Sequence, residues 1–252
     1  MKRNLPLVLA VLAFISSLVL MPHAGPVFAW AFPGSRPPVY DRGSFIALAV
    51  SHLMLVVTAV GAAIVLGTAA AITVTRPWGL AGAPLLGLVA KVGQSFPPAA
   101  VLAVLVPVLG FGTVPTLVAL FAYGLLPITE NMQAGLNGVP SAVRLAARGL
   151  GFSPWRSLLL VELPLAWPQG FAGIRTATVV GLGTATIGST VGALTLGTPI
   201  IDGLLTNKPG FVLQGAIPLA LLAIAFELFA ERLGRKAGGS THRRSKRPTP
   251  VR

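Results

Sequence analysis

The 252-residue sequence contains no cysteine, only three histidines and only six acidic residues. The absence of cysteine excludes disulfides, a cysteine nucleophile, thiolate metal sites and iron–sulfur ligation. The few histidines and acids leave little for any other metal site, and no H-E-x-x-H pattern occurs, so we expect no bound metal. The G-x-S-x-G motif of a nucleophile elbow is absent as well.

Charge is also scarce. Charged residues make up 10% of the chain and apolar residues 54%, whereas a typical soluble domain has roughly 25% charged residues. A water-soluble chain of this length needs more polar residues to cover its surface. The composition therefore excludes a soluble globular enzyme and predicts an all-α polytopic membrane protein.

The net charge of +13 is concentrated at the C-terminus, where residues 234–252 hold seven basic residues and no acid. Binding of nucleic acid would require a basic face on a folded domain, so we expect no such partner. The Gly, Ser, Thr and Pro content of residues 233–252 predicts a disordered cytoplasmic tail. This tail helps to fix the topology, or it docks to anionic lipid or to a partner.

Six segments are apolar enough to be membrane-spanning helices, each of which needs about 20 residues. They are residues 4–22, 46–74, 81–109, 113–130, 168–194 and 212–232. The third of these is interrupted near Pro97 and Pro98, which predicts a broken helix.

The basic residues orient these segments, because lysine and arginine gather on the cytoplasmic side. Lys2 and Arg3 precede the first segment and the basic tail follows the last, so we expect both termini in the cytoplasm and six crossings of the cell (inner) membrane. Residues 1–45 are expected to form the first helix and an external segment, and residues 46–232 the core. Ala29-Trp30-Ala31 resembles a signal cleavage site, but the length of the first segment favours a retained helix.

The stretch 131–167 is the one long polar connection, and it is expected on the cytoplasmic side. Apolar residues at helical spacing predict a short helix over Ser141 to Leu150, closed by glycines. Ser153 can cap a second short helix that has Pro154 at its first position.

Pro164 and Pro168 are expected to end that second helix and to turn the chain toward the fifth segment. Two short helices joined by a bend of small residues favour a docking knob for a partner protein. An amphipathic loop lying on the membrane surface is the other interpretation, and the residues alone do not decide between them.

The same stretch resembles the cytoplasmic coupling loop of ABC-importer permeases, in which Glu-Ala-Ala, three residues, Gly, and nine residues precede Ile-x-Leu-Pro. A leucine stands where the family has its usual glutamate, so any ion pair or cap made by that glutamate is missing. The resemblance implies that the loop docks in a groove of a separate ATPase subunit. The residues carried over to that contact are Leu145, Ala146, Ala147, Gly151, Val161, Leu163 and Pro164.

The likeness extends over about residues 46–232 and is most specific to the permeases of glycine betaine, choline and related osmoprotectant importers. The short sequence motifs that carry this likeness lie at residues 94–97, 123–128, 134–136, 161–166, 173–179, 183–187 and 215–218. The resemblance implies the fold of a type I ABC importer permease.

An importer of this kind needs ATP hydrolysis, which this chain is not expected to supply. A P-loop needs a Gly-Lys pair, and none of the five lysines follows a glycine. We therefore expect no cofactor on this chain, with ATP and Mg bound by a partner ATP-binding subunit. The resemblance also implies a second permease subunit, identical or homologous, and an extracytoplasmic substrate-binding protein.

Candidate residues of the translocation pathway fall in two groups. Gln94, Phe96 and Pro97 belong to the broken helix, and Tyr123 could offer a π-face to a quaternary ammonium. On the fifth segment, Thr184 and Thr186 alternate with glycines, which favours either helix packing or pathway lining.

Two further expectations concern the fifth segment. Gly181, Gly183, Gly188 and Gly192 are predicted to form one close-packing surface. Arg175 is expected to face the membrane interface or to pair with the polar loop, where Glu162 is the candidate partner.

Other functions fit the residues less well. An ion-coupled carrier acting alone usually keeps acids or histidines in mid-membrane, whereas the glutamates here lie near the ends of the predicted spans. An intramembrane serine protease lacks a recognisable Ser–His pair. Within the ATP-driven class, import of a different small solute is the alternative, because the loop reports the source of energy and not the solute.

Overall fold

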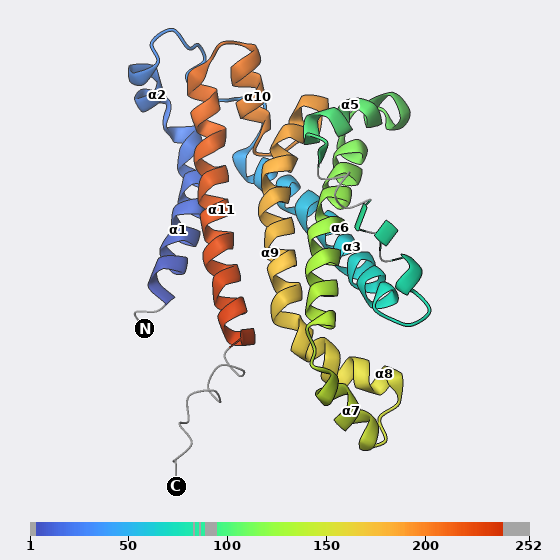
Figure 1. Ribbon diagram of the computed structural model, residues 1–252. Coiled ribbons are helices and arrows are strands. Elements are labelled where there is room, and N and C mark those ends of the chain that lie inside the picture. Colours follow the sequence, from blue (N-terminus) through green and yellow to red (C-terminus); the bar gives the residue numbers. More distant parts are fainter. Residues whose placement is uncertain (1–3, 83, 86, 89–94, 239–252) are drawn as a thin grey trace.

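The computed structural model describes residues 4–82, 84–85, 87–88 and 95–238. Within these ranges the chain is helical and contains no strand, which confirms the all-α expectation (Figure 1). The α-helices are α1 (Leu5–Leu20), α2 (Gly25–Ala31), α3 (Phe45–Val74), α5 (Pro98–Leu109), α6 (Thr113–Asn137), α7 (Ser141–Gly149), α8 (Pro154–Ser157), α9 (Leu163–Ile187), α10 (Thr198–Leu205) and α11 (Pro209–Gly238). Short 3-10 helices cover Met21–His23, Leu80–Gly82 and Gly188–Val191, and a π-helix covers Leu158–Glu162.

Among the described residues, four helices are long and apolar enough to cross a membrane: Leu5–His23, Phe45–Val74, Thr113–Asn137 and Pro209–Arg235. They match the first, second, fourth and sixth predicted segments. Helix α9 is also 25 residues long, but it is not among these four. Helix α5 has 12 residues, fewer than the about 20 that span a bilayer. The number of six spans therefore stays a prediction.

Helix α6 is central to the bundle, because it packs along both α9 and α3. Helix α11 packs against α1, α9 and α10, and α3 crosses the other long helices obliquely (Figure 1). The core holds tightly buried side chains such as Val56, Leu120 and Ile128. On the outer faces, apolar side chains such as Leu12 and Val65 stay exposed, as expected for helices that face lipid.

The two ends of the bundle differ. The start of α1, the end of α11 and helices α7 and α8 lie at one end, and α2 and α10 lie at the other (Figure 1). At the α10 end, the fully buried Gln214 accepts a hydrogen bond from the Tyr40 backbone N–H at 2.8 Å and donates one to the Pro38 carbonyl at 2.8 Å. Burial and the nearby Asp202 carboxylate raise the pKa of Tyr40 to about 12. The phenol is therefore protonated at physiological pH.

Several helix boundaries differ from the expected ones. Helix α6 continues to Asn137 and α9 begins at Leu163, so the irregular connection is shorter than residues 131–167. Pro164 and Pro168 do not end a helix, because Pro164 lies in the first turn of α9, where no backbone N–H is needed, and Pro168 lies inside α9. Neighbouring helices let membrane helices tolerate such a proline. Helix α11 continues to Gly238, and the remainder of the basic tail lies outside the described residues.

The glycines of α9 do not form one packing surface. A Cβ at Gly188 would lie 2.3 Å from Thr116, but a Cβ at Gly183 would meet no neighbour within 4 Å. Gly192 lies beyond the helix in a left-handed conformation with φ +93°. The closest backbone approach to α6 is instead at Gly173, where a Cβ would lie 2.5 Å from the Pro127 carbonyl oxygen.

Candidate functional site

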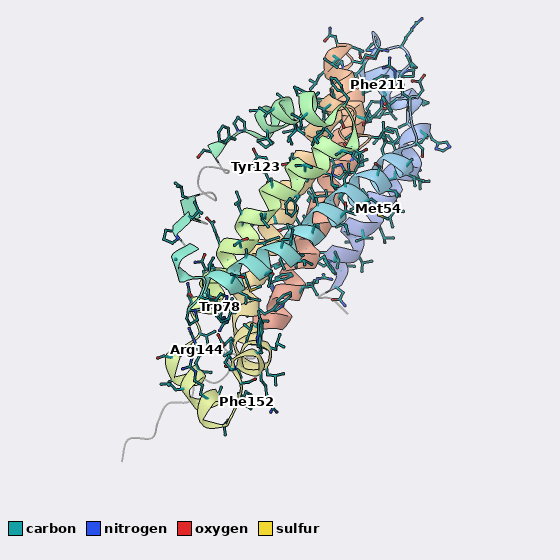
Figure 2. All side chains as sticks on the ribbon, turned by 90° about the vertical axis from the view of Figure 1, so that its right-hand side faces the viewer. Met54, Trp78, Tyr123, Arg144, Phe152 and Phe211 are labelled. Atoms are coloured by element: carbon teal, nitrogen blue, oxygen red, sulfur yellow. The ribbon has the colours of Figure 1, made fainter. Side chains whose placement is uncertain are left out.

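Residues 138–162, which we call the coupling segment, connect α6 to α9. The segment consists of α7, α8 and the π-helix, and it projects beyond the ends of α6 and α9 (Figure 1). Figure 2 shows Arg144 and Phe152 of this segment at the opposite end of the molecule from Phe211.

Residues close together in the sequence determine the bend of the coupling segment. Gly151 has φ +80°, a conformation that L side chains adopt only at a cost. Its N–H donates to the Arg148 carbonyl at 2.9 Å, and the Phe152 N–H donates to the Ala147 carbonyl at 3.1 Å. The Ser153 hydroxyl oxygen then accepts the Arg156 N–H at 3.3 Å and caps α8. The first predicted short helix and the start of the second are confirmed, but the second continues through the π-helix into α9.

The outer surface of the coupling segment carries several large apolar side chains beside the exposed Arg148 and Arg156. The large exposed apolar side chains are Leu145, Leu150, Trp155, Leu159 and Leu160, each between 59% and 76% exposed. An apolar patch surrounded by water is costly, so such a cluster is typical of a protein–protein interface.

The residues expected to contact an ATPase are not all accessible. Leu145, Ala146, Gly151 and Pro164 are exposed, and Val161 and Leu163 are half-buried. Ala147 is 4% exposed, so its side chain faces the protein and not a partner. Its small size instead suits close packing of the inner face of α7.

A buried ion pair joins the coupling segment to the end of α3. Arg76 Nη2 donates to Glu162 Oε2 at 3.0 Å and Arg76 Nη1 donates to Glu162 Oε1 at 3.4 Å. The Ser157 hydroxyl also donates to Glu162 Oε1, at 3.2 Å. The expected pairing of Glu162 with Arg175 is wrong, because Arg175 of α9 pairs with Glu227 of α11.

The sequence contains no local signal for the Arg76–Glu162 pair. The two residues are 86 positions apart, and each has several charged residues near the same expected membrane surface. Arg76 and Glu162 also line a pocket of about 390 Å³ together with Arg144 and Arg148, so this pocket is basic.

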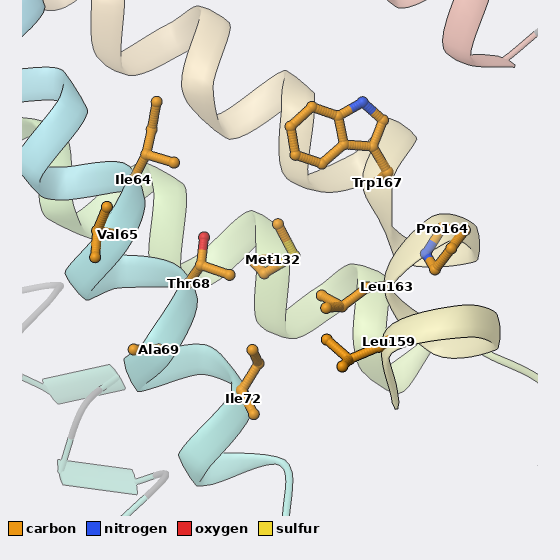
Figure 3. A pocket seen from close by; sticks show the side chains of 10 residues that line it. All are labelled: Ile64, Val65, Thr68, Ala69, Ile72, Met132, Leu159, Leu163, Pro164 and Trp167. Carbon is orange, nitrogen blue, oxygen red and sulfur yellow. The ribbon is translucent and has the colours of Figure 1, made fainter. Parts of the chain in front are cut away.

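A second, apolar groove of about 550 Å³ lies beside the ion pair. One wall is α3, from Ile64 to Ile72, and the other is formed by Leu159, Leu163 and Trp167 (Figure 3). The groove separates this part of α3 from the start of α9.

The candidate pathway residues near the broken helix are partly described by the structure. Gln94 lies outside the described residues. Pro97 is extended and precedes α5, so the break of the third segment is confirmed. The Tyr123 hydroxyl on α6 donates to the Phe96 carbonyl, which brings these two residues together (Figure 2 labels Tyr123).

On α9, Thr184 is buried and the Thr186 hydroxyl donates to the Leu182 carbonyl at 3.2 Å. A set of hydroxyls that the sequence did not reveal follows this helix: Ser189 lies 2.8 Å from the Thr195 hydroxyl and 3.2 Å from the Thr198 hydroxyl. Whether any of these residues lines a pathway stays a prediction.

Comparison with known proteins places the chain in a family. Residues 63–239 match the family described as "Binding-protein-dependent transport system inner membrane component". The chain is 38% identical over 190 residues to the osmoprotectant import permease protein OsmY of Salmonella typhimurium, an alignment that covers 75% of this chain and 80% of OsmY. It is 39% identical over 176 residues to the glycine betaine/carnitine/choline transport system permease protein OpuCB of Bacillus subtilis, covering 70% of this chain and 80% of OpuCB.

The fold is also that of a solved importer. An inward-facing structure of the MetNI methionine ABC transporter matches with a TM-score of 0.66 at 18% identity, over 76% of this chain and 95% of that chain. This match confirms the expected type I importer fold and carries no information on the solute. The chain belongs to the family of binding-protein-dependent transport system inner membrane components, and it is a membrane-embedded transport subunit of the ABC permease type.

Proposed function

We propose that this chain is the permease subunit of an ATP-driven importer for glycine betaine, choline or a related osmoprotectant. The proposal rests on the solutes for which the chain's relatives are named. Proteins that are 35% to 39% identical over at least 70% of this chain are named as permeases for osmoprotectants, for choline, and for glycine betaine, carnitine and choline.

We propose further that the exposed face of the coupling segment docks on a separate ATP-binding subunit, which binds ATP and Mg. The exposed Leu145, Leu150 and Trp155 support this docking, because they form an apolar surface at one end of the bundle. A second permease subunit and an extracytoplasmic binding protein complete the importer. Closure of the ATPase subunits then moves the segment, and the helices alternate between inward-facing and outward-facing states.

In the proposed topology, the coupling segment and both termini are cytoplasmic and α10 is external. The absence of cysteine makes single-cysteine labelling clean. We expect Ala146→Cys in intact cells to resist a membrane-impermeant maleimide, and Leu205→Cys to react with it; both side chains are exposed. The reverse pattern would show that the orientation is wrong.

A transport assay tests which solute the importer carries. A host without osmoprotectant uptake, expressing this chain with its ATPase and binding protein, is expected to accumulate labelled glycine betaine or choline. The control omits the ATPase subunit and should show no accumulation. Accumulation of only an unrelated small solute would refute the assignment of the solute, and uptake without the ATPase would refute the ATP-driven class.

A further inference from the structure

The end of α3 is fastened to the coupling segment by a polar contact between residues that are 86 positions apart in the sequence. Both oxygens of Glu162 accept from the guanidinium of Arg76, at 3.4 Å and 3.0 Å, and Ser157 donates to one of them. The side chains are 15% and 5% exposed. A paired, hydrogen-bonded geometry of this kind fixes both position and orientation.

We propose that Arg76, Glu162 and Ser157 form a positioning clamp, which makes the end of α3 move together with the coupling segment when an ATPase subunit displaces that segment. This inference rests on the proposed docking of the coupling segment. It adds a second route for the displacement, because the covalent connections of the segment lead only to α6 and α9.

Apolar packing next to the clamp also holds α3 to the coupling segment. Next to the ion pair, Ala71 of α3 belongs to a buried cluster with Leu158 of the π-helix and Ala166 of α9. From Ile72 back to Ile64, the groove of about 550 Å³ lies between α3 and Trp167 (Figure 3). The clamp and the Ala71 cluster therefore lie side by side where the end of α3 meets the segment.

The backbone at the clamp is also unusual. Glu162 is the last residue of the π-helix Leu158–Glu162, and the Leu163 N–H donates to the Leu158 carbonyl. Such π-helical turns are rare and are often found at functional sites. Here the wider turn lies directly at the residue that holds Arg76.

The test uses the complete importer reconstituted in vesicles, with solute uptake and ATP hydrolysis measured on the same preparation. We expect Glu162→Gln and Arg76→Gln each to retain the ATPase subunit and ATP hydrolysis. The solute transported per ATP should fall by at least about fivefold, the lower end of typical coupling between sites. The exchanged pair Arg76→Glu with Glu162→Arg should recover part of the lost ratio, because it restores opposite charges.

A matched control is Glu231→Gln, which removes an ion pair with Arg235 inside the single helix α11. This variant should leave the transported solute per ATP unchanged. An unchanged ratio in both single variants at the clamp would overturn the proposal. Loss of the ATPase subunit from both variants would also overturn it, because the pair would then only shape the docking surface.

A distance measurement follows α3 directly. Spin labels are placed at Ala62→Cys on α3 and Ser141→Cys on α7, which are both exposed positions. When the clamp is intact, the distance between the two labels should be the same with and without ATP. In Glu162→Gln that distance should change between the two states; an equally constant distance in this variant contradicts the clamp. A failure of the proposed docking gives a different result. If the coupling segment does not dock on the ATPase subunit, Ala146→Cys will not cross-link to that subunit even when the clamp is intact.

Discussion

Gly173→Ala is expected to destabilise the folded permease by about 1–3 kcal/mol, the usual cost of overpacking. A Cβ at this position would lie 2.5 Å from the Pro127 carbonyl oxygen, 2.8 Å from the Asn131 Cβ and 3.1 Å from the Ile128 Cα. Two of these atoms are backbone, so relief requires α6 and α9 to separate. Gly173→Val adds two further methyl groups at the same contact and should leave little folded protein. Thermal denaturation of the purified chain in detergent, followed by size-exclusion chromatography, measures both effects.

Gly183→Ala is the matched control, because Gly183 lies on the same helix and a Cβ there would meet no neighbour within 4 Å. Alanine also has the higher helix propensity, by about 1 kcal/mol. This control should therefore unfold at the same temperature as the unchanged chain or at a higher one. Equal stability of Gly173→Ala and Gly183→Ala would contradict the close approach of α6 and α9.

The bend of the coupling segment could be predicted because its signals are local. Ser153 followed by Pro154 specifies a helix start, and a glycine such as Gly151 permits the left-handed turn before it. Both features lie within a few residues of the structure that they determine. The resemblance to coupling loops then identified the surface that the bend presents, although it did not reveal that Ala147 faces inward.

Contacts between distant residues could not be predicted in the same way. Glu162 could reach several arginines near the same membrane surface, and only the oblique path of α3 brings Arg76 and not Arg175 to it. The glycines of α9 show the same limit. Which of them faces α6 depends on the rotation of α9, so Gly173 could not be distinguished from Gly183 by sequence.

The predicted end of the fifth segment, residue 194, also differs from the end of α9, and the reason is chemical. Apolar and small residues continue to residue 194, but the helix ends at Ile187. The Ser189 hydroxyl hydrogen-bonds with the hydroxyls of Thr195 and Thr198. The Thr195 hydroxyl donates to the Ala185 carbonyl of α9, and the Thr198 hydroxyl accepts the Thr195 backbone N–H. Side-chain hydroxyls that offer the backbone such alternatives compete with helix, which a hydropathy pattern does not register.

Gly151→Val is expected to lower ATP-driven uptake by about tenfold or more while leaving the amount of inserted permease unchanged. The φ of +80° at this residue costs an L side chain about 1–2 kcal/mol, and about 1.4 kcal/mol corresponds to a factor of ten. Nothing lies within 4 Å of the Cβ position, so the variant creates no internal clash. The added side chain instead projects from the exposed bend toward the proposed ATPase contact. Uptake and membrane content are measured on the same vesicles.

Gly151→Asn separates the two causes of that loss, because asparagine adopts the left-handed conformation more readily than valine but fills the same space outside the bend. If the docked ATPase occupies this space, Gly151→Asn should also lose uptake and should release the ATPase subunit in a pull-down. Gly149→Ala, at the exposed end of α7 with no neighbour within 4 Å, should keep both uptake and binding. Undiminished uptake in Gly151→Val and Gly151→Asn would mean that the coupling segment does not meet the ATPase through this bend, and the apolar surface around Leu145 and Trp155 would then need another partner.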